Sequence, residues 1–338
     1  MLVLEPLAVF LDSCELGAGG EIAVEPIGEG HSNVTLLLCR DGVEFVLRRP
    51  PRGPLPPSAH DVLREARVLR ALGPTPARVP AVLAVCENPG VIGAPFYLME
   101  KIEGHVVTSA IPAELDSVAQ RRRIGEELID ALVEVHAVDW QTIGLAGFGK
   151  PTGYLERQVR RFLGLWEHNK TREIEAVERV GHWLAGNLPT SGPATIVHGD
   201  YRLGNAMLAP DAPARIVALF DWEMTTIGDP LADLGYLCAL WADRDDPPAG
   251  MFELTGVTRA AGFPSRMELL ARYEQRSGRP MTDIRWYQTL ALWKAVVFME
   301  GNYKRAVAGT TDDPFLKQFG DGVVELAQRA ELMAYGAR

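Results

Sequence analysis

Residues 198–205 read HGDYRLGN and residues 221–223 read DWE, and these two stretches decide how the sequence is interpreted. The pattern from 194 to 221 indicates short strands around a loop, with a proline-containing turn before the last strand. Asp200 and Asn205 lie on one loop, close enough to face the same point. Asp221 ends the second strand of the predicted hairpin, whose folding back would return it to that point.

This combination of residues suits phosphoryl transfer, which depends on placing charges accurately rather than on covalent chemistry. The reaction needs a carboxylate that orients the attacking hydroxyl and accepts its proton, and Asp200 is assigned that role. It also needs oxygen ligands for Mg²⁺, which prefers carboxylates, amides, water and phosphate oxygens. Asn205 and Asp221 are the predicted metal ligands. Arg202 could neutralise charge on the transferring phosphate, so the sequence predicts ATP and Mg²⁺ as cofactors.

HGDYRLGN and DWE resemble the catalytic loop and metal-binding segment of the aminoglycoside phosphotransferase family, relatives of protein kinases. The resemblance covers nearly the whole chain and is closest to a branch also found fused to acyl-CoA dehydrogenase domains. Further matching segments occur in the expected order: VLRRPP (46–51), LREARVL (63–69), GAPFYLMEKIEG (93–104) and GDPLADLGYL (228–237). The resemblance implies an α+β, bilobal protein-kinase-like fold, with a small N-terminal five-stranded sheet lobe and a larger, mainly helical C-terminal lobe.

The order of apolar runs agrees with this division. After a short helical opening, residues 22–49 read as a three-strand meander with an Asp41-Gly42 hairpin turn. Ser58 is the predicted N-cap of a helix with one apolar stripe, and two more strands follow, completing a five-stranded sheet. From residue 104 onward amphipathic helices dominate. We therefore divide the chain into a nucleotide-binding lobe, 1–103, and a catalytic and acceptor-binding lobe, 104–338. The helices of the second lobe are expected near 116–139, 154–169, 173–187, 229–243, 264–278, 284–307 and 314–335.

Residues 28–33, GEGHSN, form a glycine-containing segment between two predicted strands, which excludes the strand-to-helix setting of a dinucleotide-binding loop. In a strand-loop-strand setting its backbone amides could cover ATP phosphates. The alternative is a flexible hairpin turn. The candidate nucleotide-binding residues here are Gly28, Gly30, His31, Ser32 and Asn33. No GxxxxGK[ST] motif occurs, so a P-loop enzyme is excluded.

Other nucleotide-binding residues follow from the resemblance. Arg48 occupies the strand position where many relatives carry lysine, and Glu65 would be its ion-pair partner; the alternative is that Arg48 solvates a strand end. An arginine fork can hold a carboxylate and a phosphate oxygen, but it does not replace lysine without consequence. The Glu100 carbonyl and the Ile102 amide would pair with adenine at the hinge between the lobes.

Three polar residues near the loop favour structural roles. His198 is interpreted as a buried hydrogen-bonding brace. Asp233 resembles the family's buried carboxylate that holds the backbone amides of the catalytic loop. Asp229 precedes a proline and is either a helix N-cap or a ligand. The other histidines show no spacing typical of a metal site.

Composition excludes several classes of protein. The chain has 338 residues, 47% hydrophobic and 23% charged, which is typical of a globular protein, and its net charge of −10 argues against nucleic-acid and anionic-membrane partners. Four scattered cysteines and an N-terminus without a basic segment favour the cytoplasm. We expect a monomer or weak homodimer that acts on a small-molecule hydroxyl acceptor.

The acceptor is expected to bind mainly to the helical lobe. Residues 241–338 carry 13 basic and 13 acidic side chains, so they lack the carboxylate excess that a polycationic aminoglycoside would need. Lys294 lies in the apolar run LALWKAVVF, where it either reaches solvent or pairs with an anion. Aromatic residues on the same helix offer apolar surface: Trp286, Tyr287, Trp293, Phe298 and Tyr303. A hydroxyacyl group, free or as its CoA thioester, is the leading acceptor hypothesis. The alternatives are a true aminoglycoside phosphotransferase, a catalytically weak nucleotide-binding protein, and a protein kinase, against which the missing activation-loop features argue.

Overall fold

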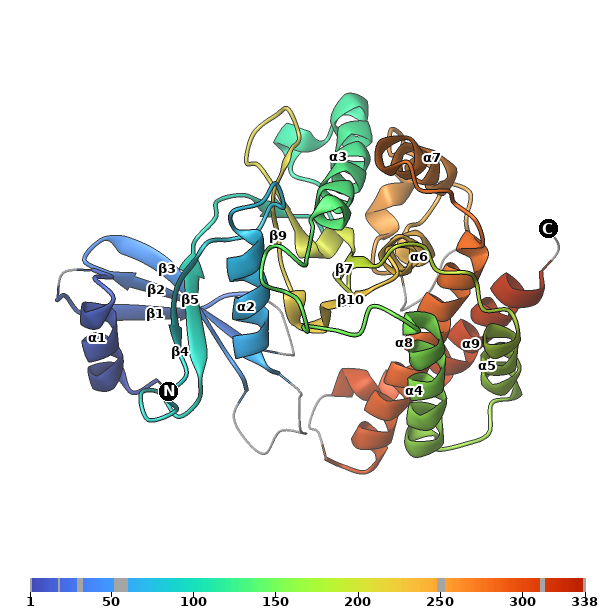
Figure 1. Ribbon diagram of the computed structural model, residues 1–338, viewed down its shortest axis with the longest axis horizontal. Helices are drawn as coiled ribbons and strands as arrows, with labels where there is room; N and C mark the ends of the chain where they lie inside the picture. Colours follow the sequence, from blue (N-terminus) through green and yellow to red (C-terminus); the bar gives the residue numbers. More distant parts are fainter. Residues whose placement is uncertain are drawn as a thin grey trace.

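The N-terminal region is an antiparallel five-stranded sheet with one helix on each face (Figure 1). The computed structural model describes residues 2–17, 19–28, 33–51, 60–247, 253–310 and 314–336. The strand order is β1-β2-β3-β5-β4. The elements are α1 (Leu4–Ser13), β1 (Ile22–Pro26), β2 (Val34–Arg40), β3 (Val43–Arg49), α2 (Val62–Leu72), β4 (Val82–Cys86) and β5 (Phe96–Glu100). The predicted meander, the fifth strand and the helix after the third strand are all present.

Alternating side chains divide this sheet into two packed faces, as the period of a strand requires. One face packs against α1, and its buried residues include Phe45, Leu47, Phe96 and Leu98 together with Leu7 and Leu11 of the helix. The opposite face, with Val46, Tyr97 and Met99, packs against α2 and is continuous with the core of the helical region. The sheet is therefore anchored to the rest of the protein through α2.

The start of α2 differs from the sequence prediction. Ser58 lies outside the described residues, and the helix begins at Val62. The side chain of Asp61 accepts a hydrogen bond from the Arg64 backbone N–H at 3.0 Å, which satisfies one of the free amides of the first turn. His60, just before it, has a positive φ of 58°, so the chain turns sharply into the helix.

Beyond residue 104 two small sheets carry the loops of the site, and helices surround them (Figure 1). One sheet pairs β6 (His105–Val106), β8 (Ala206–Leu208) and β9 (Ile216–Leu219), and the other pairs β7 (Thr195–Val197) with β10 (Thr226–Gly228). The helices are α3 (Val118–Ala137), α4 (Tyr154–Asn169), α5 (Glu175–Gly186), α6 (Leu231–Leu240), α7 (Arg266–Ser277), α8 (Ile284–Val307) and α9 (Phe319–Tyr335). Short 3₁₀ turns occur at Ala113–Leu115, Leu203–Asn205, Trp222–Met224, Gly256–Arg259 and Pro314–Gln318. The domain boundary at residues 103 and 104 stays a prediction.

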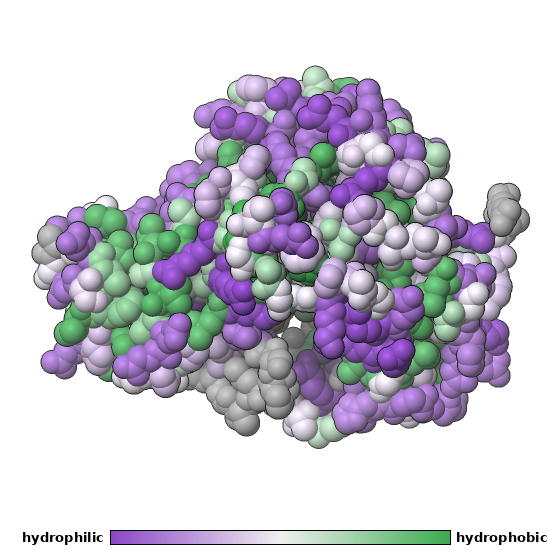
Figure 2. Space-filling model, in the orientation of Figure 1, coloured by the Kyte–Doolittle hydropathy of each residue, from purple (hydrophilic) through white to green (hydrophobic). Residues whose placement is uncertain are grey.

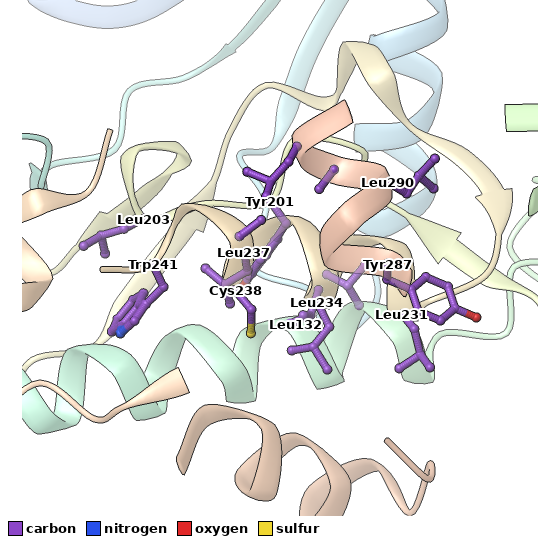
Figure 3. Packing of buried hydrophobic residues seen from close by; sticks show 14 of the residues in the cluster. Leu132, Tyr201, Leu203, Leu231, Leu234, Leu237, Cys238, Trp241, Tyr287 and Leu290 are labelled. Atoms are coloured by element: carbon purple, nitrogen blue, oxygen red, sulfur yellow. The ribbon is translucent and has the colours of Figure 1, made fainter. Parts of the chain in front are cut away.

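The core of this region lies directly beneath the HGDYRLGN loop (Figure 3). Leu234, Leu237 and Cys238 of α6 are buried between Leu132 of α3 and Leu290 of α8. Tyr201 of the loop is 1% exposed, and its hydroxyl donates to the Leu128 carbonyl at 2.6 Å. The loop is thus fixed to a rigid base. Among the described residues, no helix is long and apolar enough to cross a bilayer.

Candidate active site

Asp200 and Asn205 face each other across the loop, as their spacing predicts. The Asn205 Nδ2 group donates to both the Asp200 backbone carbonyl and the Asp200 carboxylate oxygen Oδ2, each at 2.8 Å. The Asp200 side chain is 23% exposed, so its carboxylate stays accessible. Because its amide nitrogen is engaged in this way, Asn205 keeps its side-chain oxygen for another partner.

On the inner side of the loop, Asp233 of α6 holds the backbone. Its Oδ2 accepts from the His198 N–H at 2.7 Å and its Oδ1 from the Gly199 N–H at 2.8 Å. His136 of α3 lies 3.2 Å from Oδ2 and is itself bonded to Tyr273. Although burial opposes ionisation, the hydrogen bond from His136 keeps the pKa of Asp233 below its ordinary value. The structural role implied for Asp233 is matched by its contacts.

His198 makes the predicted braces. Its side chain is buried, its Nε2 atom lies 2.9 Å from the Phe220 carbonyl, and its Nδ1 atom accepts from the Asp200 N–H. Asp229 uses both carboxylate oxygens within the protein, one for the Leu231 N–H and one for the Tyr287 hydroxyl. The N-cap of α6 is Pro230, so Asp229 is not the cap itself but accepts, from one position earlier, the hydrogen bond of the first helical amide, which is a structural role.

Asp221 is brought to the loop by the β8–β9 hairpin. The Phe220 N–H donates to the Asn205 carbonyl at 2.9 Å, which places Asp221 beside Asn205, the other predicted metal ligand. Asp221 itself has φ 65° and ψ 60°, a left-handed conformation that few side chains adopt, and it begins the Trp222–Met224 turn. The Trp222–Met224 turn packs closely on Gly199, and only glycine allows this, because a Cβ there would lie 2.7 Å from the Met224 carbonyl oxygen.

Arg48 connects the two lobes at this point. Its Nε lies 2.9 Å from Glu65 Oε2, and its Nη2 lies 2.7 Å from Asp221 Oδ1. Glu65 is 2% exposed, and its other oxygen accepts from the Trp222 N–H at 3.2 Å. Burial raises the pKa of Glu65 to about 7 against the opposing effect of Arg48. Burial works against the charge of Arg48, but Glu65 and Asp221 outweigh it and raise the pKa of Arg48. The expected Arg48–Glu65 pair is formed.

The remaining predicted nucleotide contacts are only partly described. Gly30, His31 and Ser32 lie outside the described residues, whereas Gly28 has a positive φ of 79°. Asn33 is buried and donates through Nδ2 to Glu223 Oε2 at 3.1 Å, while its Oδ1 has no partner among the described residues.

At the predicted hinge, the Glu100 backbone N–H and side chain both bond to Ala81. Within the described part of the chain, the Ile102 N–H forms no hydrogen bond to another backbone carbonyl. Ile102 could therefore still donate to a ligand.

The donor set fits a magnesium ion shared with phosphates. Asp221 offers a carboxylate that is 29% exposed, and Asn205 offers an amide oxygen, both hard ligands of the kind that Mg²⁺ selects. Arg202 lies over Gly204, where a Cβ would meet its guanidinium, and its Nε is 3.7 Å from Asp200 Oδ2. Among the described residues no cluster of three or more His, Cys, Asp or Glu could hold a metal by itself.

A cavity of about 470 Å³ opens beside Asp200 and is walled mainly by α6, α8 and α9. Gly199 and Asp200 of the loop line this cavity. Its other charged lining residues are Glu223, Lys294 and Arg329, and the rest of the lining is mostly apolar. Lys294 lies 5.0 Å over the Phe162 ring and forms no ion pair with a carboxylate in the described chain. Burial, and next the charge of Arg161, lower the pKa of Lys294 to about 8.

The aromatic surface expected on α8 is mostly core, which corrects the sequence interpretation. Trp286, Tyr287 and Trp293 are at most 2% exposed. Their polar atoms bond inside the protein, for example Trp293 Nε1 to the Val177 carbonyl at 2.9 Å. Because α8 packs against α4, α5, α6 and α9, only Phe298 of the predicted aromatic set reaches the cavity.

Sequence reasoning missed some residues of the site. Tyr236 hydrogen-bonds to Asp200, and burial together with that carboxylate raises the pKa of its phenol. It follows Asp233 by three positions on α6, so it shares a helix face with a residue already identified, and that spacing was an available signal. The Asn33–Glu223 contact carried no comparable signal, because it joins residues 190 positions apart.

Comparisons with known proteins identify the family of the chain. The family model described as "Phosphotransferase enzyme family" matches residues 23–287. Mouse acyl-CoA dehydrogenase family member 10 is 33% identical over 314 residues, which cover 92% of this chain and 29% of that protein. The chain spans less than half the length of the first curated relatives it matches.

Solved structures show the same fold. A crystal structure of a candidate aminoglycoside phosphotransferase from Ralstonia eutropha superposes with a TM-score of 0.86 at 32% identity, covering 100% of both chains. An aminoglycoside phosphotransferase in ternary complex with AMP-PNP and hygromycin B has a TM-score of 0.62 at 14% identity, covering 98% of this chain and 100% of that one. The second likeness shows the fold alone.

Proposed function

The chain belongs to the phosphotransferase enzyme family, and from that premise we propose that it transfers the γ-phosphate of Mg·ATP to a hydroxyl of a small, non-aminoglycoside molecule. One observation carries the proposal: Asp200, Asn205 and Asp221 meet beside a largely apolar cavity, with Arg48 reaching them from the other lobe. The proposal includes the cytoplasm as the location and a monomer or weak homodimer as the active form.

In this proposal the chain's own residues position the reactants. Asp200, oriented by Asn205 Nδ2, orients the acceptor hydroxyl and takes its proton. Asn205 Oδ1 and the Asp221 carboxylate would hold Mg²⁺, which would neutralise charge on the phosphates. Arg202, beside Asp200, adds positive charge where the phosphoryl group passes.

Arg48 takes the place of the lysine that the resemblance leads one to expect. Its guanidinium spans Glu65 and Asp221, so its position is set by carboxylates from both lobes. A planar arginine fork can keep Glu65 and also turn one nitrogen toward a phosphate oxygen. The adenine would lie near the Glu100 carbonyl and the Ile102 N–H, with residues 28–33 over the phosphates.

The cavity favours an acceptor with an apolar body. It contains two carboxylates, both close to the predicted reaction centre, and two cations, so it has no acidic surplus for a polycation. Lys294, which has no carboxylate partner among the described residues, favours a molecule that is neutral or carries an anionic group. A hydroxyacyl compound, free or as its CoA thioester, fits these features, and the CoA-linked relatives support the same class.

The test is incubation of the protein with ATP, Mg²⁺ and a pooled metabolite extract, followed by mass spectrometry for products that have gained one phosphoryl group. Asp200→Asn protein serves as the matched control. Steady-state kinetics then compare kanamycin-type aminoglycosides with hydroxy acids and hydroxyacyl-CoAs. Efficient turnover of aminoglycosides alone would overturn the acceptor class. Nucleotide binding without transfer to any acceptor would instead support the nucleotide-binding protein considered above.

A further inference from the structure

A second hollow, of about 430 Å³, lies on α4 and the segment that leads into it. Its lining includes Lys150, Arg157, Gln158, Arg160, Arg161 and Thr226. Four of these side chains are cations, and no lining residue is a carboxylate. The space-filling view shows hydrophilic residues gathered over α4 (Figure 2). We call this feature the α4 hollow.

The cations of the α4 hollow lack an ion-pair partner in the part of the chain that the structure describes. Within the described residues, none of the four forms an ion pair with a carboxylate, and Arg157 bonds instead to the backbone carbonyls of Lys150 and Thr152. Glu156 precedes Arg160 by one helical turn, yet the two do not pair in the described structure.

Helix α3 shows the contrasting arrangement. Arg121, Arg122 and Arg123 are also consecutive basic residues, and each of them pairs with a carboxylate, at 2.8, 3.1 and 3.6 Å respectively. In a chain with a net charge of −10, unpaired cations around one hollow create a local field that attracts anions.

The α4 hollow and the cavity beside Asp200 are built from neighbouring segments. Thr226 lies two positions beyond Met224, which lines that cavity. Arg161 of the hollow and Lys294 of the cavity lie on the packed helices α4 and α8 respectively. Helix α4 also packs directly on α8, which supplies most of one cavity wall. A single extended ligand could therefore occupy both spaces.

We propose that the α4 hollow binds a phosphate-bearing arm of the acceptor, while the apolar, hydroxyl-bearing part of the same molecule occupies the cavity. This inference rests on the proposed function and specifies its substrate class. Guanidinium groups match phosphate oxygens in geometry and charge, and Arg160 and Arg161 are exposed and available. The nucleotide phosphates belong elsewhere in this scheme, between Arg48 and Asp221.

The experiment measures binding rather than turnover. The protein is saturated with Mg·ADP and titrated by calorimetry with coenzyme A, with pantetheine, which lacks the phosphates, and with inorganic pyrophosphate. We expect coenzyme A to bind most tightly. The double variant Arg160→Gln/Arg161→Gln should weaken its binding by about tenfold or more, because two charge-assisted contacts are lost. Arg160→Lys/Arg161→Lys should retain much of the affinity.

A matched control removes the same charge elsewhere. Arg70→Gln/Arg215→Gln changes two exposed arginines that form no ion pair among the described residues, and it should leave the Kd unchanged. Equal weakening in both double variants, or none in the Arg160/Arg161 variant, would overturn the site. So would the absence of coenzyme A binding.

Two further outcomes identify the ligand. Pyrophosphate binding as tightly as coenzyme A would identify a free-phosphate site and overturn the acceptor arm. Arginine-dependent coenzyme A binding without turnover of any acceptor would support the α4 hollow and count against the proposed transfer, so the two failures are distinguishable.

Discussion

The two sides of the HGDYRLGN loop both carry aspartates, but the protein fills the hydrogen-bond acceptor capacity of these carboxylates to different degrees. On the inner side, Asp233 is 1% exposed and accepts hydrogen bonds from two backbone amides, with His136 beside it. On the outer side, Asp200 and Asp221 are 23% and 29% exposed, and each has a limited set of partners.

This difference separates a structural role from a chemical one. A carboxylate whose acceptor capacity is filled by the protein stabilises the fold, because removing it leaves buried donors unsatisfied. A carboxylate with free oxygens can still bind a metal or accept a proton. Substitutions on the outer side should therefore change activity at constant stability, and substitutions on the inner side should change stability first.

The largest expected effect is on turnover. Asp200→Asn should reduce kcat by roughly 10²–10⁴-fold, the usual share of general-base catalysis and positioning, with nucleotide affinity nearly unchanged. Steady-state kinetics on an identified acceptor, with a nucleotide titration in parallel, checks this. Wild-type turnover in the variant would remove Asp200 from the role of base.

Asp233→Asn should lower the free energy of unfolding by about 2–4 kcal/mol, since a charged acceptor for buried donors is replaced by an amide. Urea unfolding monitored by tryptophan fluorescence measures the change, with Asp200→Asn as the control from the outer side. Equal unfolding free energies for the two variants would contradict the contrast between the two sides of the loop.

Asp221→Ala should reduce the affinity for Mg·ATP by about a hundredfold while leaving magnesium-free ATP binding much less affected, because Mg²⁺ is held by few protein oxygens. Calorimetry with and without Mg²⁺ makes the comparison. If both titrations matched those of the wild type, Asp221 would not be a metal ligand.

The smallest expected effect is on pH dependence. The pKa of Glu65 is raised to about 7, chiefly by burial, so Glu65 is ionised above that pH and protonated below it. As the pH falls through about 7, the ion pair with Arg48 loses its charge, and kcat/KM for ATP should fall by up to about tenfold. The Glu65 contribution to folding stability has the opposite sign: it is present at low pH and is lost as the pH rises through about 7.

Glu65→Gln should remove this acid limb from the pH profile of kcat/KM. Glu44→Gln, a substitution of a more exposed carboxylate on β3, should keep it. A limb of the same size that persists in Glu65→Gln would show that Glu65 is not its source.

Local sequence patterns were sufficient for much of the fold. The Asp41-Gly42 turn and the alternating apolar residues around it predict the meander, and the family resemblance predicts the arrangement of the two lobes, which the comparisons confirm. The predicted start of α2 was wrong, because Ser58 and Asp61 are both residue types that favour the N-cap position and only the folded chain selects one.

The site was predictable where its residues share a loop or a hairpin. Asp200, Asn205 and Asp221 come together through short-range folding. The burial of Trp293 could not be predicted, since it depends on helices packed around α8 from distant parts of the sequence. The basic run on α4 is visible in the sequence, but the lack of ion pairs at these cations among the described residues is a property of the folded protein.

The contact between Arg48 and Asp221 implies an order of binding. Without nucleotide, Arg48 holds one oxygen of the Asp221 carboxylate at 2.7 Å, so a free cation that binds this carboxylate must lie beside a guanidinium. ATP changes this arrangement, because its phosphates give Arg48 a new partner and supply oxygens to the metal. We expect Mn²⁺ alone to bind weakly and Mn²⁺ with ATP to bind tightly, as measured by electron paramagnetic resonance. Equal affinity in both titrations would show that Arg48 does not control metal entry.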